Sequence, residues 1–402
     1  MTGGIEVSQR IAALSESQTL AMAQRVRELR AAGRPILSLI LGEPDFPVPL
    51  ALREAAIAAI QEGHAPYPPV AGLMPLREAI AAYYQRRYGL SFHPSQVVVS
   101  NGSKQAIFNA LLSLLEPGEE VILPAPYWVS YLPIVQLAGG YPRVVQTTAH
   151  QGYKLTPEQL DSVLSRHTRL VILCSPSNPT GTAYTLSELQ SLAEVLESYP
   201  RVWVLSDEIY ELIRYEGVHV SPAQIPTLFD RTVIVNGFSK AFAMPGWRLG
   251  YLIAPPSVAQ AAIKVQGQVT AGANLIAQKA ALAGLQSNLT EILSPMLQAF
   301  RERRDYIYAF LQAHLPETQP YLPEGAFYFF LDVSEFIGRR TLRGSFIPNV
   351  EELVEYLLEW DVAVVSGMGF GSDKHIRLSY AVSLADIQAG LPRLIQALRA
   401  LA

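Results

Sequence analysis

The chain contains the run Thr232-Val-Ile-Val-Asn-Gly-Phe-Ser-Lys-Ala-Phe-Ala-Met-Pro-Gly-Trp-Arg-Leu-Gly-Tyr251. Its apolar, β-branched start, residues 233–235, predicts a buried strand that ends at Asn236-Gly237. Lys240 follows among small and apolar neighbours. A lysine that loses the hydration of its ammonium has a lowered pKa, and its amine becomes a usable nucleophile. Schiff-base chemistry with a carbonyl cofactor requires such an amine, although a lone lysine after a strand is more often a surface residue.

Two more apolar runs end in polar residues. Residues 170–174 lead into Ser175-Pro-Ser-Asn178, and residues 202–205 lead into Ser206-Asp-Glu-Ile-Tyr210. Short continuous apolar runs of this kind are typical of strands buried on both faces of a parallel sheet, and residues 186–196 between them have helical spacing. Ligands of open α/β sheets bind beyond the carboxyl ends of the strands. We therefore expect one crevice to gather the polar residues that follow these ends: Asn178, Asp207, Tyr210, Ser239 and Lys240.

Three motifs occur together in this chain: Asn178-Pro-Thr-Gly181, Ser206-Asp-Glu-Ile-Tyr210 and Ser239-Lys-Ala-Phe-Ala-Met-Pro-Gly-Trp-Arg-Leu-Gly250. In this combination the chain resembles the pyridoxal-phosphate-dependent aminotransferases of fold type I, specifically the class I/II family that includes aspartate aminotransferase. The resemblance runs from about Ser15 to Arg399. It implies a chain that transfers an amino group between an L-amino acid and a 2-oxo acid by a ping-pong mechanism.

The fold expected from the pattern and from the resemblance is α/β, with two domains. Residues 51–289 alternate strand-like and helix-like segments, and we expect a large cofactor-binding domain with a mostly parallel central sheet. Residues 1–50 and 290–402 would form a smaller α+β domain from both chain ends. Strands are expected there at residues 325–331, 362–365 and 376–380.

The resemblance implies a role for each matched residue around the cofactor ring. Lys240 would form the Schiff base with pyridoxal 5′-phosphate and then, as free amine, move the proton at the substrate α-carbon. Asp207 matches the carboxylate that keeps the pyridine nitrogen protonated. Tyr210 and Asn178 match the donors to the ring hydroxyl oxygen, and Trp128 matches the aromatic residue that stacks on the ring.

A phosphate needs fixed donors and positive charge. Residues 97–108 predict a strand, a small polar turn and a helix start, which presents backbone N–H groups to an anion. The resemblance assigns the cofactor phosphate to the turn residues and two further side chains: Gly102, Ser103, Lys104, Ser239 and Arg248. It also assigns Tyr67, which would reach the phosphate of the neighbouring subunit. A tyrosine that crosses in this way implies a homodimer with shared active sites.

The α-carboxylate of an amino acid needs a planar, bidentate cation, which arginine supplies. Arg377 alternates with Ile376 and Leu378, which predicts a half-buried strand. By resemblance Arg377 binds this carboxylate, and Gly42 meets it through its backbone. The resemblance also brings to the substrate two residues already assigned to the cofactor, Trp128 and Asn178.

A further set of matched residues concerns the choice of substrate. Lys104 occupies the position where one bacterial aspartate aminotransferase subgroup places a lysine that meets the distal carboxylate of aspartate or glutamate. Ser17 and Thr19 match the small hydroxyl residues that accompany it. The resemblance thus favours aspartate and glutamate. The alternatives are that Lys104 faces phosphate or solvent, and that the chain is an aromatic, alanine or prephenate aminotransferase or a fold-type-I β-lyase. By resemblance, residues 265–274 border the active site, and they carry glycines and alanines where relatives often have serine and threonine, which would favour bulkier substrates.

Composition agrees with a packed globule: the 402 residues are 50% hydrophobic and 16% charged. A net charge of −4 gives no electrostatic footprint for nucleic acid, and a single cysteine excludes an internal disulfide and a cysteine-rich metal site, so no metal is expected. Charges interrupt the N-terminal segment, and no apolar stretch is long enough to span a membrane, so we expect a cytoplasmic protein. The alternative is a plastid or organelle protein trimmed of its transit peptide, which would have the same features.

One competing motif is the nucleophile elbow of α/β-hydrolases, which Gly237-Phe-Ser-Lys-Ala241 resembles. It ends in alanine where the motif has glycine. The required acid and histidine would be Asp373 and His375, which are too close in sequence to come from separate loops. Labelling of Ser239 by a fluorophosphonate would support this alternative.

Overall fold

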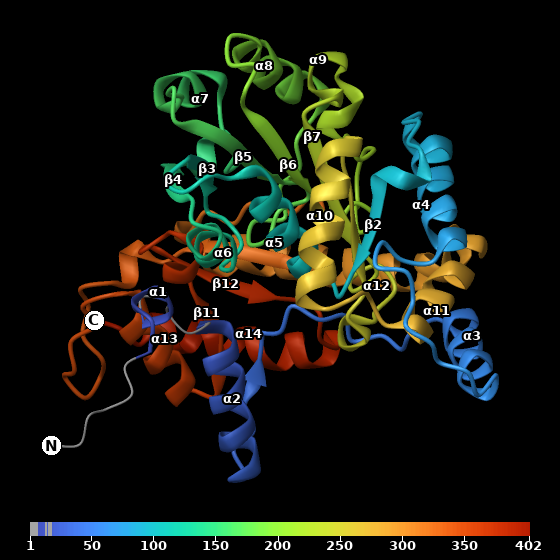
Figure 1. Ribbon diagram of the computed structural model, residues 1–402. Helices are drawn as coiled ribbons and strands as arrows, with labels where there is room; N and C mark the ends of the chain where they lie inside the picture. The colour runs from blue at the N-terminus through green and yellow to red at the C-terminus, as the bar shows by residue number, and fades with distance from the viewer. Residues whose placement is uncertain (1–6, 13, 15–17) are drawn as a thin grey trace, which may run out of the picture.

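The structure, a computed structural model, describes residues 7–12, 14 and 18–402 (Figure 1). Residues 97–253 contribute a seven-stranded sheet. In spatial order its strands are β2 (Val97–Ser100), β8 (Gly250–Ile253), β7 (Thr232–Gly237), β6 (Trp203–Asp207), β5 (Thr168–Cys174), β3 (Glu120–Ala125) and β4 (Tyr141–Gln146). β8 runs antiparallel to both neighbours, and the other pairs are parallel. The predicted α/β class and mostly parallel sheet are confirmed.

Helices cover both faces of this sheet. In β5, Leu170 and Ile172 pack into one apolar cluster with α5 and α10, whereas Val171 and Leu173 pack into another with α7 and α8. Burial of alternate residues on opposite faces explains why the strand sequences are continuously apolar. The helices that flank or extend this sheet are α3 (Leu50–Gln61), α4 (Met74–Tyr88), α5 (Ser103–Leu114), α6 (Tyr131–Leu137), α7 (Pro157–Val163), α8 (Leu186–Glu197), α9 (Pro226–Phe229), α10 (Pro256–Val269) and α11 (Leu275–Gln286).

Local sequence fixes the start of α8. The backbone N–H of Glu188 donates to the Thr185 hydroxyl at 3.3 Å, and the backbone N–H of Thr185 donates to the Glu188 carboxylate at 2.7 Å. This capping box satisfies donors that the first helical turn leaves free. The helix predicted over residues 186–196 is therefore found as Leu186–Glu197.

The two ends of the chain meet in a second region, where blue α2 lies beside the red C-terminal elements in Figure 1. β1 (Leu37–Ser38) pairs in parallel with β10 (Val362–Ala363), and β11 (Val365–Ser366), β12 (His375–Ser379) and β9 (Tyr328–Asp332) form an antiparallel sheet. The helices here are α1 (Gln9–Ala12), α2 (Gln18–Ala31), α12 (Leu289–His314), α13 (Val350–Glu359) and α14 (Leu384–Arg399). We propose that the boundaries near residues 50 and 290 separate this region from the larger one.

Two expectations about this region were wrong in detail. The single strand expected at residues 362–365 is divided into β10 and β11, which pair in different sheets. An apolar run carries no mark of the point where a chain changes its partner strand. The strand around Arg377 was expected to be half-buried, but Ile376, Arg377 and Leu378 are all at most 2% exposed, because other elements cover both of its faces.

No helix within residues 7–12, 14 and 18–402 is both long and apolar enough to cross a membrane.

Candidate active site

A cavity of about 470 Å³ lies where the carboxyl ends of β5, β6 and β7 face the small antiparallel sheet. The five polar residues expected to converge from the strand ends all line it. So do most of the other predicted residues: Thr19, Gly42, Ser103, Lys104, Trp128, Arg248 and Arg377. Gly102 and Tyr67 are not among its lining residues, and Ser17 lies outside the described residues.

Lys240 follows the end of β7, and its Nζ donates to the backbone carbonyl of Gly42 at 2.6 Å. Burial lowers the pKa of Lys240 from 10.5 to about 8. The carboxylate of Glu43 opposes this shift, whereas the cations of Arg377 and Arg248 add to it. Near pH 8, a large fraction of this amine is therefore neutral and able to act as a nucleophile or base.

Asp207 is the last residue of β6 and is 4% exposed. The hydroxyl of Tyr131 donates to its Oδ2 at 2.6 Å, and the backbone N–H of Ile209 donates to its Oδ1 at 3.2 Å. Burial raises the pKa of Asp207 to about 6, and these hydrogen bonds oppose the rise. Above pH 6 the carboxylate is ionised and can hold a cationic ring nitrogen in the cavity.

Tyr210 lies three residues after Asp207, in the turn that follows β6, and is 2% exposed. Its hydroxyl oxygen lies 2.8 Å from that of Tyr328. Burial, with a smaller contribution from Tyr328, raises the pKa of Tyr210 well above its ordinary value. The hydroxyl therefore keeps its proton at neutral pH and can donate it in a hydrogen bond.

Arg377 on β12 is a buried cation without a buried counter-ion. Its Nη1 donates to Asn178 Oδ1 at 3.1 Å, and its Nη2 donates to the carbonyl of Ile40 at 2.6 Å. The guanidinium carbon lies 4.5 Å and 5.0 Å from the ring centroids of Tyr328 and Phe370. Within the described part of the chain, Nε has no hydrogen-bond partner and no carboxylate pairs with the group. A buried charge left in this state favours binding of an anion.

The turn between β2 and α5 has the geometry of an anion cradle. Gly102 caps the helix with φ +86°, and an added Cβ would come within 2.6 Å of Arg248 Nη2. Glycine is required there both for the backbone conformation and for the approach of the arginine. The Ser103 hydroxyl donates to the carbonyl of Asn236 at 2.9 Å, so the turn is fixed to the end of β7. A helix N-terminus beside an arginine suits a phosphate.

Three predicted residues that line the cavity are not fully buried, and we call Thr19, Lys104 and Trp128 the rim. The Lys104 ammonium lies 5.0 Å from the centroid of the Trp128 ring. Partial desolvation, and then the neighbouring Arg248, lower the pKa of Lys104. The hydroxyl of Thr19 is buried and has no partner among the described residues.

Tyr67 is 93% exposed and is not among the residues that line the cavity of this single chain. Exposed apolar side chains also occur on α3, α4 and α10: Leu50, Ile57, Ile60, Met74 and Val269.

Sequence reasoning missed three features of the site. Tyr131 and Tyr328 both line the cavity and contact predicted residues, and the carbonyl of Gly42 holds the Lys240 amine. The two tyrosines carry no motif of their own. Their only signal was position: Tyr131 follows Trp128 by three residues, and Tyr328 stands in the apolar run expected as a strand.

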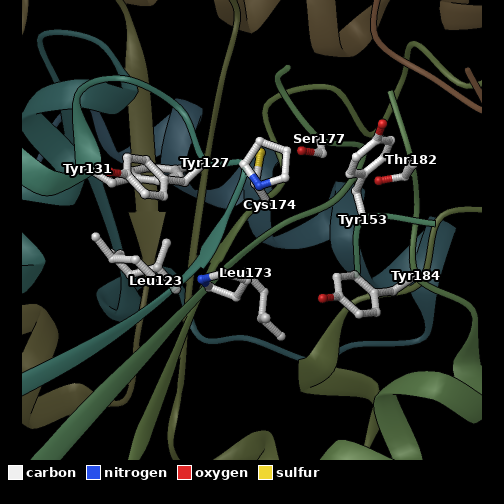
Figure 2. Close-up of a pocket in the computed structure, with 12 residues that line it drawn as sticks. Leu123, Tyr127, Tyr131, Tyr153, Leu173, Cys174, Ser177, Thr182 and Tyr184 are labelled. Atoms are coloured by element: carbon white, nitrogen blue, oxygen red, sulfur yellow. The ribbon is translucent and has the colours of Figure 1, made fainter. Parts of the chain in front are cut away.

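A second cavity adjoins the first behind Tyr131 and Cys174, which line both. In the view of Figure 2, Tyr131 lies on one side of Cys174, and Ser177 and Thr182 lie on the other. Its volume of about 20 Å³ is enough for one water molecule. It therefore cannot admit an amino acid, and the larger cavity is the candidate active site.

The comparisons with known proteins agree with this geometry. A family model described as "Aminotransferase class I and II" matches residues 34–394. The chain is 45% identical over 398 residues to a "Bifunctional aspartate aminotransferase and glutamate/aspartate-prephenate aminotransferase" of Petunia hybrida, covering 98% of this chain and 83% of that protein. It is 44% identical over 380 residues to an "Aspartate/prephenate aminotransferase" of Cereibacter sphaeroides, covering 94% of each.

Solved structures show the same relationship. The aspartate aminotransferase of Rhizobium meliloti superposes with a TM-score of 0.94 at 38% identity, covering 99% of this chain and 100% of that one. The aspartate aminotransferase of Thermus thermophilus with maleate gives a TM-score of 0.91 at 38% identity, covering 98% and 99%. The match of family model, sequence and fold over nearly the whole length shows that this chain belongs to the class I and II aminotransferases.

Proposed function

We propose that this aminotransferase uses pyridoxal 5′-phosphate to move an amino group between aspartate or glutamate and a 2-oxo acid. The observation that carries the proposal is the arrangement of one cavity. It holds an amine with a pKa near 8, a buried carboxylate, and a buried arginine without a counter-ion: Lys240, Asp207 and Arg377.

The residues present fit this cofactor. Lys240 would hold its carbonyl carbon, Asp207 its ring nitrogen, and Tyr210 with Asn178 its ring oxygen, while Trp128 covers the ring. The phosphate would lie in the cradle formed by Gly102, Ser103, Ser239 and Arg248. When bound, the cofactor supplies an electron sink for the electron pair that remains when the substrate α-carbon loses its proton.

The chain's own groups perform the other tasks. Arg377 binds the substrate α-carboxylate through two parallel N–H donors and so orients the α-carbon, a role supported by its unpartnered Nε. Lys240, when neutral, accepts the α-proton and returns it, and its pKa of about 8 suits both directions near neutral pH. The buried Tyr210 remains a hydrogen-bond donor throughout.

A dicarboxylic substrate is supported by the rim. Lys104 offers a cation, and Thr19 offers a hydroxyl that has no partner among the described residues; both line the cavity. The relatives named above carry aspartate in their names, and the Thermus structure holds maleate, a dicarboxylate. Prephenate, which the names of two relatives include, is also a dicarboxylate and is the second candidate.

We also propose a homodimer with shared active sites. Support comes from the exposure of Tyr67 and of the apolar side chains on α3, α4 and α10, which are of the kind that subunits bury. Sedimentation velocity tests this assembly, since a monomer at micromolar concentration would contradict it. The expected cytoplasmic location is a separate proposal, tested by cell fractionation.

Absorbance spectroscopy tests the central proposal. We expect the protein loaded with pyridoxal phosphate to show a visible band, and L-aspartate without any 2-oxo acid to convert it to one at shorter wavelength. L-alanine and L-phenylalanine serve as matched substrates without a distal carboxylate. Conversion by these alone would leave transamination intact and contradict the dicarboxylic preference, whereas a protein that gains no band would contradict the whole proposal.

A further inference from the structure

Tyr328 touches three of the proposed functional groups at once. It begins β9, pairs with Ser379 of β12, and is fully buried. Its hydroxyl lies 2.8 Å from that of Tyr210, and its ring lies against the guanidinium of Arg377 at 4.5 Å. An added Cβ at Gly42 would come within 2.5 Å of its hydroxyl oxygen.

We propose that Tyr328 is a positioning residue that couples the occupation of Arg377 by a carboxylate to the hydrogen-bond strength of Tyr210. The inference rests on the proposed function, because it assigns Arg377 to the substrate and Tyr210 to the cofactor ring. Asn178 already joins these two subsites, because its Oδ1 accepts from Arg377 Nη1 at 3.1 Å and its side chain is assigned to the ring oxygen. The inference adds a second connection, and Tyr328 is the residue that carries it.

The number of protons on the two tyrosine hydroxyls determines the direction of the hydrogen bond between them. A tyrosine hydroxyl has one proton to donate. In the part of the chain that the structure describes, the Tyr210 hydroxyl has one hydrogen-bond partner, and that partner is Tyr328. Both residues line the cavity. If the proton of Tyr210 is given to a ligand in the cavity, Tyr328 must be the donor between the two tyrosines, which fixes the direction of the pair.

The guanidinium of Arg377, which lies against the ring of Tyr328, changes the strength of this hydrogen bond. Burial raises the pKa of Tyr328, and the cation of Arg377 is the largest influence that opposes the rise. A cation beside the ring makes the hydroxyl a better donor, because it stabilises negative charge on the oxygen. A carboxylate bound to Arg377 cancels this effect. Tyr328 then donates less strongly to Tyr210, and Tyr210 donates less strongly into the cavity.

Other charged or titratable groups also influence the pKa values of Tyr210, Tyr328 or Lys240 and therefore contribute to any pH titration: Arg377, Arg248, Asp207, Glu43 and Cys174. Removal of the Tyr328 hydroxyl leaves each of them in place.

The test is a pH titration of the visible band of the protein loaded with pyridoxal phosphate, with and without succinate. Succinate has carboxylates but no amino group, so it occupies the site without reacting. The midpoint reports loss of the proton held at the Lys240 nitrogen. In the unaltered protein we expect succinate to raise it, since an added anion stabilises the protonated form.

In Tyr328→Phe we expect the midpoint without succinate to rise by about 0.5 to 1 pH unit, because Tyr210 loses the bond that strengthens it. We expect the succinate-induced shift to be smaller than that in the unaltered protein but not absent, because the contact of Arg377 with Asn178 and its direct effect on Lys240 both remain. A succinate-induced shift equal to that of the unaltered protein overturns the proposal, whatever the midpoint does. Tyr184→Phe is the matched control, since this tyrosine is also buried and hydrogen-bonded but does not line the larger cavity.

Gly42→Ala gives a second test that does not depend on the folding of Tyr328→Phe. The added methyl group displaces the Tyr328 hydroxyl without deleting it, so the succinate-induced shift should again be reduced. A full shift in that variant contradicts the coupling. Failure of the proposed function and failure of this inference give different results. If the protein without substitutions shows no visible band, the proposed function is contradicted. If it shows the band but succinate does not shift the midpoint, only this inference is contradicted.

Discussion

The inner wall of the cavity and its rim are built in different ways. The inner wall consists of Asn178, Asp207, Tyr210 and Arg377, which are at most 6% exposed and are hydrogen-bonded to other protein groups. On the rim, Lys104 is exposed and the hydroxyl of Thr19 has no partner among the described residues.

This difference separates the residues proposed to carry out the reaction from those proposed to select the substrate. Packing of the central sheet and the small sheet holds the inner-wall groups in fixed positions, as preorganised catalysis requires. On the rim, Trp128 packs against a buried apolar cluster, whereas Lys104 and Thr19 are less constrained and can change without disturbing the core. Substitutions in the inner wall should therefore affect every substrate, and substitutions of Lys104 or Thr19 on the rim should affect some substrates more than others.

The largest effect is expected at the amine that the inner wall surrounds. Lys240→Ala should lower kcat for every amino acid by about 10⁴-fold, because the variant lacks the group that moves the α-proton. A coupled assay with aspartate and 2-oxoglutarate measures this loss. Lys264→Ala, an exposed lysine on α10, is the matched control and should retain activity. Turnover near that of the unaltered protein in Lys240→Ala would remove the mechanism.

The second prediction concerns pH. Uptake of pyridoxal phosphate by the cofactor-free protein needs the neutral amine of Lys240, whose pKa is lowered to about 8. The amine is protonated below that value, so the rate of uptake should rise about tenfold per pH unit up to pH 8 and then level off. Stopped-flow absorbance across a pH series measures it. A rate that keeps rising toward 10.5, the ordinary lysine value, would show that burial does not act on this group.

Arg377→Lys should raise KM about 10- to 100-fold for all amino acids alike, because lysine cannot reproduce the two parallel hydrogen bonds to the α-carboxylate. Steady-state kinetics with aspartate, alanine and phenylalanine compare the substrates. Arg143→Lys, in a partly exposed ion pair on β4, controls for the exchange itself. A loss confined to aspartate would move Arg377 from the shared carboxylate to the distal one.

Lys104→Ala should lower kcat/KM for aspartate and glutamate about three- to tenfold, since an exposed ion pair contributes only about 1 kcal/mol. Activity with alanine should stay within about twofold of the unaltered value. The ratio of the two is the measurement. An equal loss for all substrates would instead assign Lys104 to the cofactor phosphate.

Thr185→Ala is a change outside both regions. It removes the N-cap of α8 and should lower the free energy of unfolding by about 1 kcal/mol while leaving the kinetics of every substrate unchanged. Chemical denaturation and the coupled assay measure the two quantities. A changed ratio of kcat/KM for aspartate to that for alanine in this variant would contradict the separation of stability from substrate selection.

Local sequence patterns predicted part of the inner wall, for a physical reason. Asn178, Asp207 and Lys240 each follow an apolar run, and the carboxyl ends of adjacent parallel strands must lie close together. Their meeting could be inferred from local patterns. The family resemblance, not periodicity, supplied Arg377, and the periodicity around it gave the wrong exposure because a second element covers the expected open face.

Contacts between distant segments carried no local signal. The carbonyl of Gly42 that holds Lys240 and the hydroxyl of Tyr328 that meets Tyr210 are brought in from segments 198 and 118 residues away. The division of residues 362–365 between two sheets likewise depends on partners elsewhere, since β10 pairs with β1 and β11 pairs with β12.

The pairing of the chain ends has a consequence for the order of events during synthesis. Arg377 donates to the carbonyl of Ile40 across 337 residues of sequence, and Leu37 pairs with Val362. The central sheet, complete by residue 253, can assemble while the ribosome is still translating. The carboxylate site cannot, because its two sides are the first and last parts to be made. A nascent chain stalled before residue 375 therefore contains Lys240 but lacks Arg377, the cation proposed to bind the substrate α-carboxylate.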